Sequence, residues 1–181
     1  ISVGESLPIN FKNLKSISPD NLIIIDTRSK FKYLLGHIPK AIHLGKWQDF
    51  TQNVKGVRGL LIKNPTFIVN KFNSYGIHPK KHIVIYGDPD DPWRTDGRFF
   101  WMFERFGFNK VTIYEGGVKN WKNSGEKLEF GQGSALAKPL LSVKDIRLND
   151  EVSAEQQWIL ERLNSKTLAI IDNRTRDEYL G

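Results

Sequence analysis

Apolar runs alternate with amphipathic stretches along most of this chain. Mainly apolar runs lie at residues 22–25, 83–86 and 111–114, with a shorter one at 41–44. Runs without polar alternation are typical of strands buried on both faces of a parallel sheet. Because helical patterns separate these runs, the sequence predicts an α/β fold: a central parallel sheet with helices on both sides.

The spacing of apolar residues also indicates where helices lie. Pro65 can occupy the first turn of a helix over 65–72, which the stretch 74–76 would end. A second helix is expected to follow Thr95 or Asp96, either of which can cap it, and to stop at Gly107. Its aromatic residues recur every three or four positions, which predicts a buried face rather than a cofactor site: Phe99, Phe100, Phe103 and Phe106. The polar stretch 48–59 is predicted to be a loop or an insertion.

Two segments of the chain are nearly alike. Residues 23–28 read Ile-Ile-Ile-Asp-Thr-Arg, and residues 168–174 read Leu-Ala-Ile-Ile-Asp-Asn-Arg. In both, a tyrosine follows the aspartate after seven positions, and the two aspartates, Asp26 and Asp172, are 146 positions apart. Self-similarity at so long a distance indicates a tandem domain rather than a solenoid. A helix over 154–162, capped by Ser153 or the acidic residues before it, would precede the second strand as residues 11–17 precede the first.

The residues after the first of these runs suggest a structured turn. Asp26 can accept hydrogen bonds from backbone donors, and Arg28 offers a planar fork to a carboxylate. Gly36 permits unusual backbone angles, and Pro39 fixes the next turn. His37, between them, is either a ligand or catalytic base, or a residue that orders the turn through a backbone bond; we favour the second interpretation.

These motifs together resemble the rhodanese family. Its N-terminal signature is matched by Asp-x-Arg, an aromatic residue and Gly-His-Ile-Pro-Lys-Ala-Ile-His at 36–43, and its last strand and turn by Val-Thr-Ile-Tyr-Glu-Gly-Gly at 111–117. The segment from Arg98 to Gly107 resembles the helix after the active-site loop in the N-terminal domain of two-domain sulfurtransferases. The family-signature residues, expected to be structural, are Asp26, Arg28, Gly36, His37, Pro39, Arg98, Gly116, Gly117, Trp121, Asp172 and Arg174.

The resemblance implies a rhodanese-like three-layer α/β/α domain at 1–130, with a central parallel sheet of five strands, and the start of a second copy. A small-residue stretch supplies a linker at 131–140, and residues 141–181 are expected to begin a truncated second domain. One helix and one strand cannot bury enough surface to be stable alone. We therefore expect residues 140–181 to pack on the first domain or to require a further C-terminal part.

Composition restricts the chemistry more than the fold. The 181 residues contain no cysteine, which excludes disulfides, thiolate metal sites and thiol redox chemistry within the chain. The net charge of +7 is spread as single lysines and lysine pairs, so it favours a solvated surface over a nucleic-acid surface. No apolar run approaches the ~20 residues that a membrane helix needs. We expect a soluble protein, cytoplasmic or periplasmic, with no cofactor.

In a rhodanese, a cysteine nucleophile follows the strand that corresponds to 83–86, and backbone amides and a helix N-terminus lower its pKa. Here Gly87 holds that position, and the aspartates at 88, 90 and 91 would oppose a thiolate or an anionic donor. The domain is therefore predicted to be catalytically silent. The three aspartates could instead hold calcium, but the EF-hand spacing is absent, and a hydrolase with Asp88 as nucleophile lacks an evident base; solvated turn residues are the preferred interpretation.

By analogy with two-domain sulfurtransferases, the nucleophile would lie beyond Gly181, in a C-terminal rhodanese domain of the same protein that is this chain's expected partner. Glu178 stands where mercaptopyruvate-type members have a substrate-binding arginine, which favours thiosulfate or a similar small anionic sulfur donor. Arg174 and Arg176 are possible anion contacts, although fold-stabilising roles are preferred. The alternatives are a non-enzymatic module for protein binding or regulation and, last, a phosphatase of related fold, which also needs the absent cysteine.

Overall fold

The computed structural model describes residues 8–133 and 141–181. The chain divides into two compact units, Ile1–Asn149 and Asp150–Gly181, and each is described by itself. The first unit contains the sheet and both hydrophobic cores, so it positions the candidate site.

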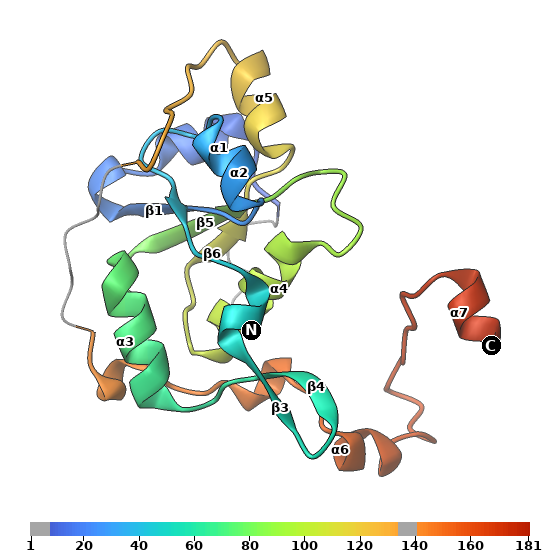
Figure 1. The fold of residues 1–181 in the computed structure, drawn as a ribbon. Coiled ribbons are helices and arrows are strands. Elements are labelled where there is room, and N and C mark those ends of the chain that lie inside the picture. Colours follow the sequence, from blue (N-terminus) through green and yellow to red (C-terminus); the bar gives the residue numbers. More distant parts are fainter. Residues whose placement is uncertain (1–7, 134–140) are drawn as a thin grey trace. The chain divides into compact units, whose positions relative to one another are not determined.

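Four parallel strands form the sheet of the first unit. They are β1 (Leu22–Asp26), β2 (Ile42–His43), β5 (His82–Tyr86) and β6 (Val111–Ile113), in the order β2-β1-β5-β6 (Figure 1). The predicted strands are confirmed, but the expected number of five is wrong for the described residues. Ile9 forms only a single parallel bridge with Tyr114 at the β6 edge, because α1 begins two residues later at Phe11.

Helices cover both faces of this sheet, as predicted for a three-layer fold. On one face lie α1 (Phe11–Ser16), α2 (Lys30–Leu34) and α5 (Gly117–Asn123), and on the other lie α3 (Pro65–Tyr75) and α4 (Thr95–Arg105) (Figure 1). Successive residues of β1 enter different cores: Ile23 and Ile25 pack with α3 and α4, and Ile24 packs with α1 and α5. Burial on both faces is why the strands are apolar without alternation.

The two large helices are where the sequence placed them, but their caps differ. Asn64 caps α3 through the backbone N–H of Phe67 at 3.1 Å, and Gly76 ends the helix in the left-handed conformation, with φ 72°. For α4, neither predicted cap is used, because the helix already begins at Thr95. The N-cap is Arg94, whose side chain makes no capping hydrogen bond, and Asp91 Oδ2 accepts the Thr95 N–H at 2.9 Å.

The polar stretch predicted to be a loop or an insertion contains a short helix and two strands. After a short 3-10 turn, η2 (Trp47–Phe50), it forms an antiparallel hairpin of β3 (Thr51–Val54) and β4 (Val57–Leu61). Lys55 and Gly56 both have positive φ, 47° and 82°, as a two-residue hairpin turn of matching twist requires. The hairpin was missed because its strands are largely exposed and carry no apolar alternation.

Residues 141–149 belong to the first unit, although the sequence assigned them to a second domain. Leu141 is buried in the core with α3 and α4, and the side chain of Asn73 both accepts from its N–H and donates to its carbonyl, each at 2.9 Å. Asn149 donates its N–H to the carbonyl of Arg105 at 2.9 Å. The segment passes η3 (Val143–Asp145) on the way. Within the expected linker, residues 134–140 lie outside the described residues.

The second unit shows no copy of the sheet. It contains η4 (Asp150–Val152), α6 (Gln156–Leu160) and α7 (Arg176–Leu180). The predicted helix over 154–162 is shorter, and its N-cap is Glu155 rather than Ser153. The predicted strand at 168–172 does not form: Ile170 and Ile171 are 58% and 84% exposed, because no neighbouring strand within the unit pairs with them.

Candidate functional site

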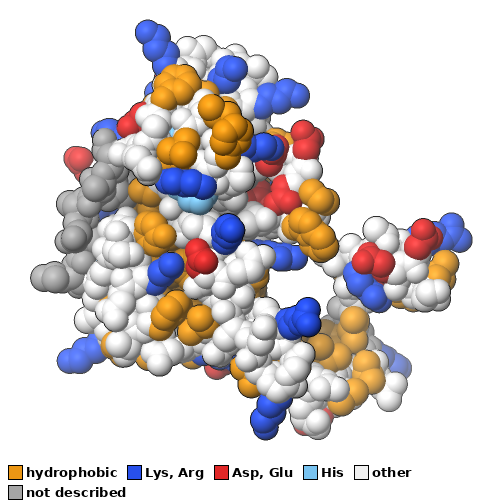
Figure 2. Space-filling model, viewed as in Figure 1, with side chains coloured by type: hydrophobic (Ala, Val, Ile, Leu, Met, Phe, Trp, Pro, Cys, Tyr) orange, Lys and Arg blue, Asp and Glu red, His pale blue; other side chains and the backbone are white. Residues whose placement is uncertain are grey.

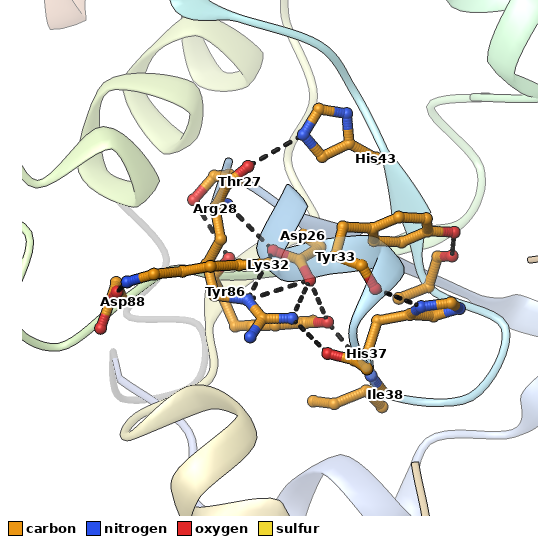
Figure 3. A network of polar contacts seen from close by, with 12 residues as sticks. Asp26, Thr27, Arg28, Lys32, Tyr33, His37, Ile38, His43, Tyr86 and Asp88 are labelled. Atoms are coloured by element: carbon orange, nitrogen blue, oxygen red, sulfur yellow. Dashed lines mark hydrogen bonds and ion pairs between the residues drawn. The ribbon is translucent and has the colours of Figure 1, made fainter. Parts of the chain in front are cut away.

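The Asp-x-Arg motif at the end of β1 is the centre of a buried polar network (Figure 3). The Asp26 carboxylate accepts hydrogen bonds from the Arg28 N–H at 2.9 Å, from its Nη2 at 2.6 Å and from the Tyr86 hydroxyl at 2.7 Å. Arg28 Nη2 also donates to the carbonyl of Gly36 at 2.7 Å. The Tyr86 hydroxyl in turn accepts from the Ile38 N–H at 3.1 Å. The network therefore joins β1, β5 and the turn after α2.

The charges in this network fix its protonation. Burial lowers the pKa of Arg28, but hydrogen bonds and the negative charge of Asp26 outweigh burial, so the net shift is upward. Burial and the same carboxylate raise the pKa of the Tyr86 hydroxyl. Tyr86 therefore stays a neutral donor and Arg28 a cation. We call the hydrogen-bonded group of Asp26, Arg28 and Tyr86 the clamp.

His37 is fully buried in the turn after α2 and makes contacts that hold the turn. Its Nδ1 is 2.9 Å from the carbonyl of Tyr33, and its ring stacks on the Tyr33 ring with centroids 3.9 Å apart. The other ring nitrogen is 4.0 Å from a carboxylate oxygen of Glu129. The backbones of His37 and Glu129 also exchange hydrogen bonds, each 2.9 Å long.

The C-terminal signature lies beside the end of β5. Gly116 and Gly117 have φ 73° and 50°, and a side chain at Gly117 would place its Cβ 2.6 Å from the carbonyl of Gly87. Trp121 on α5 is buried and donates its Nε1–H to the carbonyl of Lys127 at 2.8 Å. Glycine at 117 thus allows the first turn of α5 to approach the loop that follows β5.

Gly87, the position at which the sequence analysis expects the nucleophile of a rhodanese, is closely surrounded. A Cβ there would lie 3.0 Å from Thr27 Oγ1 and 3.2 Å from Asp96 Cβ. Asp96 is buried and holds Arg94 at 3.0 Å. A carboxylate this close to the position of the nucleophile disfavours a thiolate.

The amides of the following loop are largely used within the loop itself. The N–H groups of Trp93 and Thr95 donate to the carboxylate of Asp91, at 3.0 and 2.9 Å. Those of Asp91 and Arg94 donate to the carbonyls of Asp88 and Asp91, at 3.0 and 3.2 Å. These donors cannot also converge on a sulfur atom at position 87. The aspartates of the loop thus organise it.

The loop aspartates have other local partners. Lys32 forms an ion pair with Asp88, and this hydrogen bond lowers the pKa of the Asp88 carboxyl. Partial burial raises the pKa of the Asp91 carboxyl, but hydrogen bonds from Thr95 and Trp93 outweigh burial, so the net shift of this pKa is downward. No group of three or more histidine or acidic side chains in the described parts of the chain is placed to hold a metal ion.

The second Asp-x-Arg motif has the same local geometry as the first but lies exposed. Asp172 accepts hydrogen bonds from the Arg174 N–H at 3.0 Å and from its Nη2 at 2.6 Å, and this pairing lowers the pKa of Asp172. Glu178 belongs to a capping box with Thr175: its carboxylate accepts the Thr175 N–H at 3.0 Å. Arg176 begins α7. The Thr-x-x-Glu pattern gives Glu178 a structural role that the sequence analysis missed.

A cleft of about 490 Å³ opens beside the clamp, at the carboxyl ends of β1 and β2. Of the predicted site residues, only Arg28 and Arg98 reach it. It is otherwise lined by Thr27, Ser29, Lys30, His43, Gly45, Lys46, Trp47, Gln48, Trp93 and Thr95. The sequence analysis missed this grouping, because its members come from three separate segments, 27–30, 43–48 and 93–98, with no shared motif.

The comparisons with known proteins agree with this geometry. The family model for the rhodanese-like domain matches residues 11–124, so the chain belongs to the rhodanese-like domain family. A thiosulfate sulfurtransferase from Pseudomonas aeruginosa is 28% identical over 160 residues, which are 88% of this chain and 56% of that protein. The rat thiosulfate sulfurtransferase is 31% identical over 85% of this chain and 50% of its own length. The chain thus spans about half the length of these curated relatives.

A similar fold is present in a crystal structure of SseA from Escherichia coli, reported with the catalytic mechanism of 3-mercaptopyruvate sulfotransferases. The two superpose with a TM-score of 0.79 at 22% identity, over 97% of this chain and 68% of that one. A mouse 3-mercaptopyruvate sulfurtransferase is 26% identical over 67% of this chain and 39% of its own length. Among the described residues, no helix is long and apolar enough to cross a membrane.

Proposed function

We propose that this chain is the non-catalytic part of a rhodanese-type sulfurtransferase, which moves sulfane sulfur from thiosulfate or a similar donor to a thiophilic acceptor. The observation that carries the proposal is the state of the nucleophile position. Gly87 stands there, its loop amides are used internally, and the 181 residues contain no cysteine. The family scaffold around this position is nevertheless intact.

In the proposed reaction the cysteine belongs to a C-terminal rhodanese domain beyond Gly181. Its thiolate attacks the outer sulfur of thiosulfate, the S–S bond breaks, and sulfite leaves with the electron pair. The acceptor, for example cyanide, then attacks the bound sulfur and restores the thiolate as thiocyanate forms. The present chain would supply architecture and one wall of the interface where this site lies.

Two features support a tandem partner. The curated relatives that match are about twice as long as the matched region, and the Asp172–Arg174 motif repeats the local geometry of Asp26 and Arg28. In a complete second domain, Asp172 and Arg174 would form a buried clamp of the same kind. Arg174 would then be occupied structurally, which leaves Arg176 as the better candidate for an anion contact.

A second candidate is a non-enzymatic binding or regulatory module. The observation that favours it is that the whole clamp of Asp26, Arg28 and Tyr86 is retained although the nucleophile is missing. Fold stability alone can maintain such a network, with no chemistry at the site.

The experiment that separates the two candidates uses the complete reading frame. If it continues with Gly-His-x-Pro and a strand followed by cysteine, the full protein should transfer sulfur from thiosulfate to cyanide. Replacement of that cysteine by serine should abolish turnover, while the same change at any other cysteine should not. A reading frame that ends near Gly181, or a full protein with no turnover, would favour the module.

A further inference from the structure

We infer that the cleft beside the clamp binds a small organic anion that carries a planar aromatic ring. Gly87 lines a different hollow together with Asp96 and Gly117, and the cleft adjoins the nucleophile position through Thr27, whose Oγ1 lies 3.0 Å from a Cβ built at residue 87. The inference does not depend on where sulfur is transferred.

The charge of the lining is the first argument. Arg28, Lys30, Lys46 and Arg98 contribute cationic groups, and no carboxylate among the described residues lines the cleft. Arg28 is neutralised in part by Asp26, and Lys30 donates to the neutral amide of Gln132 at 3.1 Å. On the face shown in Figure 2, lysine and arginine side chains are spread over the surface, with acidic side chains among them.

Lys46 and Arg98 are the cations most available to a ligand. Both side chains are exposed, and within the described residues neither forms an ion pair. The acidic groups closest in sequence are Asp49, whose carboxylate accepts the Lys46 N–H at 3.0 Å, and Asp91, whose carboxylate accepts the Thr95 N–H at 2.9 Å and interacts electrostatically with Arg98. Two cations at one rim attract an anion, whereas the aspartates at 88, 90 and 91 line the adjoining hollow rather than the cleft itself.

His43 adds a neutral polar wall. Burial lowers its pKa, against the opposing effect of its hydrogen bond to the carbonyl of Arg28, where Nε2 lies at 2.8 Å. Since a carbonyl accepts, Nε2 carries the proton and Nδ1 is left as an acceptor. At neutral pH the positive charge of the cleft thus comes from lysine and arginine alone.

The second argument is that Trp47 and Trp93 line the cleft, which favours a ligand with a planar aromatic ring. Trp47 is half-buried and lies edge-on to the buried Phe99, with ring centroids 5.7 Å apart. Trp93 is 70% exposed in the loop before α4, and the guanidinium of Arg98 lies 5.6 Å from its ring centre. An exposed indole with a cation over it can stack a planar ligand while the cation meets the charge. The volume of about 490 Å³ suits such a ligand better than a bare oxyanion.

The test is isothermal titration calorimetry on the 181-residue chain, with phenyl phosphate as the probe. Inorganic phosphate and phenol serve as control ligands, because each carries only one of the two groups of the probe. We expect phenyl phosphate to bind more tightly than either. Lys46→Ala and Arg98→Ala should each weaken binding at least tenfold. Trp93→Ala should weaken phenyl phosphate binding but leave inorganic phosphate unchanged.

Lys122→Ala is the matched control, because it removes the same charge from an exposed position on α5, outside the cleft. It should change the affinity less than twofold. Absence of heat with phenyl phosphate at low salt would overturn the inference, as would an equal loss in the control, which would indicate general attraction to a basic chain. Equal affinities for phenyl phosphate and inorganic phosphate would refute the ligand class. None of these results depends on sulfur transfer, so they are separable from the proposed function.

Discussion

The two Asp-x-Arg motifs allow one perturbation to be made twice, in a buried and in an exposed setting. Asp26→Asn keeps the size of the side chain but removes the charge that holds Arg28 and Tyr86. Asp26 is fully buried and the Arg28 side chain is only 10% exposed. Removal of one partner of a buried ion pair leaves an uncompensated charge, which costs about 3–5 kcal/mol. The Tyr86 hydroxyl, which also donates to Asp26, will be held less firmly.

Asp172→Asn is the matched control. The atoms of Asp172 and Arg174 contact one another at nearly the same distances as in the first motif, but the Arg174 side chain is 55% exposed. Water replaces the lost contacts there, so we expect no resolvable change in stability. The comparison of Asp26→Asn with Asp172→Asn therefore isolates the effect of burial on stability, since the two motifs share their sequence pattern and internal geometry.

The assay is urea unfolding at pH 7, followed by tryptophan fluorescence and far-UV circular dichroism. Asp26→Asn should lower the free energy of unfolding by about 3–5 kcal/mol with an unchanged slope against urea. A loss below about 1 kcal/mol, the size expected of an exposed pair, would refute the role given to the clamp. A comparable loss in Asp172→Asn would show that burial does not set the strength of the motif.

Three further predictions concern residues around the clamp and loop. Burial raises the pKa of the Tyr33 hydroxyl to about 12, so the stabilisation by the neutral hydroxyl is complete below pH 10 and is lost as pH rises towards 12. At 1.36 kcal/mol per pKa unit the loss is about 3 kcal/mol. Tyr33→Phe should remove this part of the fall in unfolding free energy at alkaline pH, measured by urea unfolding. Gly117→Ala should lower the thermal midpoint, because its Cβ would meet the Gly87 carbonyl at 2.6 Å and φ is positive; an unchanged midpoint would contradict the close approach. Gly87→Cys should not transfer sulfur from thiosulfate to cyanide, and its thiol should react slowly with disulfide reagents at pH 7, because Asp96 disfavours the thiolate. Turnover in this variant would show that the domain lacked only the sulfur atom.

Much of the first unit could be predicted from the sequence because burial there is continuous. The apolar run 22–25 enters two cores, so its strand and its parallel pairing follow from composition alone. The helix with Phe99 and Phe103 is similarly determined, since its aromatic stripe packs on the sheet. The sequence analysis expected structural roles for Asp26 and Arg28 but paired them neither with each other nor with Tyr86; in the structure the aspartate and arginine of both motifs pair locally.

The features that sequence reasoning missed depend on distant contacts. Ile170 and Ile171 have the composition of a strand, but a strand forms only when another strand pairs with it, and this unit supplies none. The cleft was missed for a related reason, because Lys46 and Trp93 are far apart in the chain and meet only through the fold. The hairpin of β3 and β4 depends on a Lys-Gly turn, a weaker signal than Asn-Gly.

The measurement that tests the central claim most directly is mass spectrometry of the isolated 181-residue chain after incubation with thiosulfate, together with the rate at which thiocyanate forms from cyanide. The account predicts an unchanged mass and a rate equal to the uncatalysed background, because the chain has no atom that can hold a persulfide. A stable gain of one sulfur atom, or turnover above background, would contradict it.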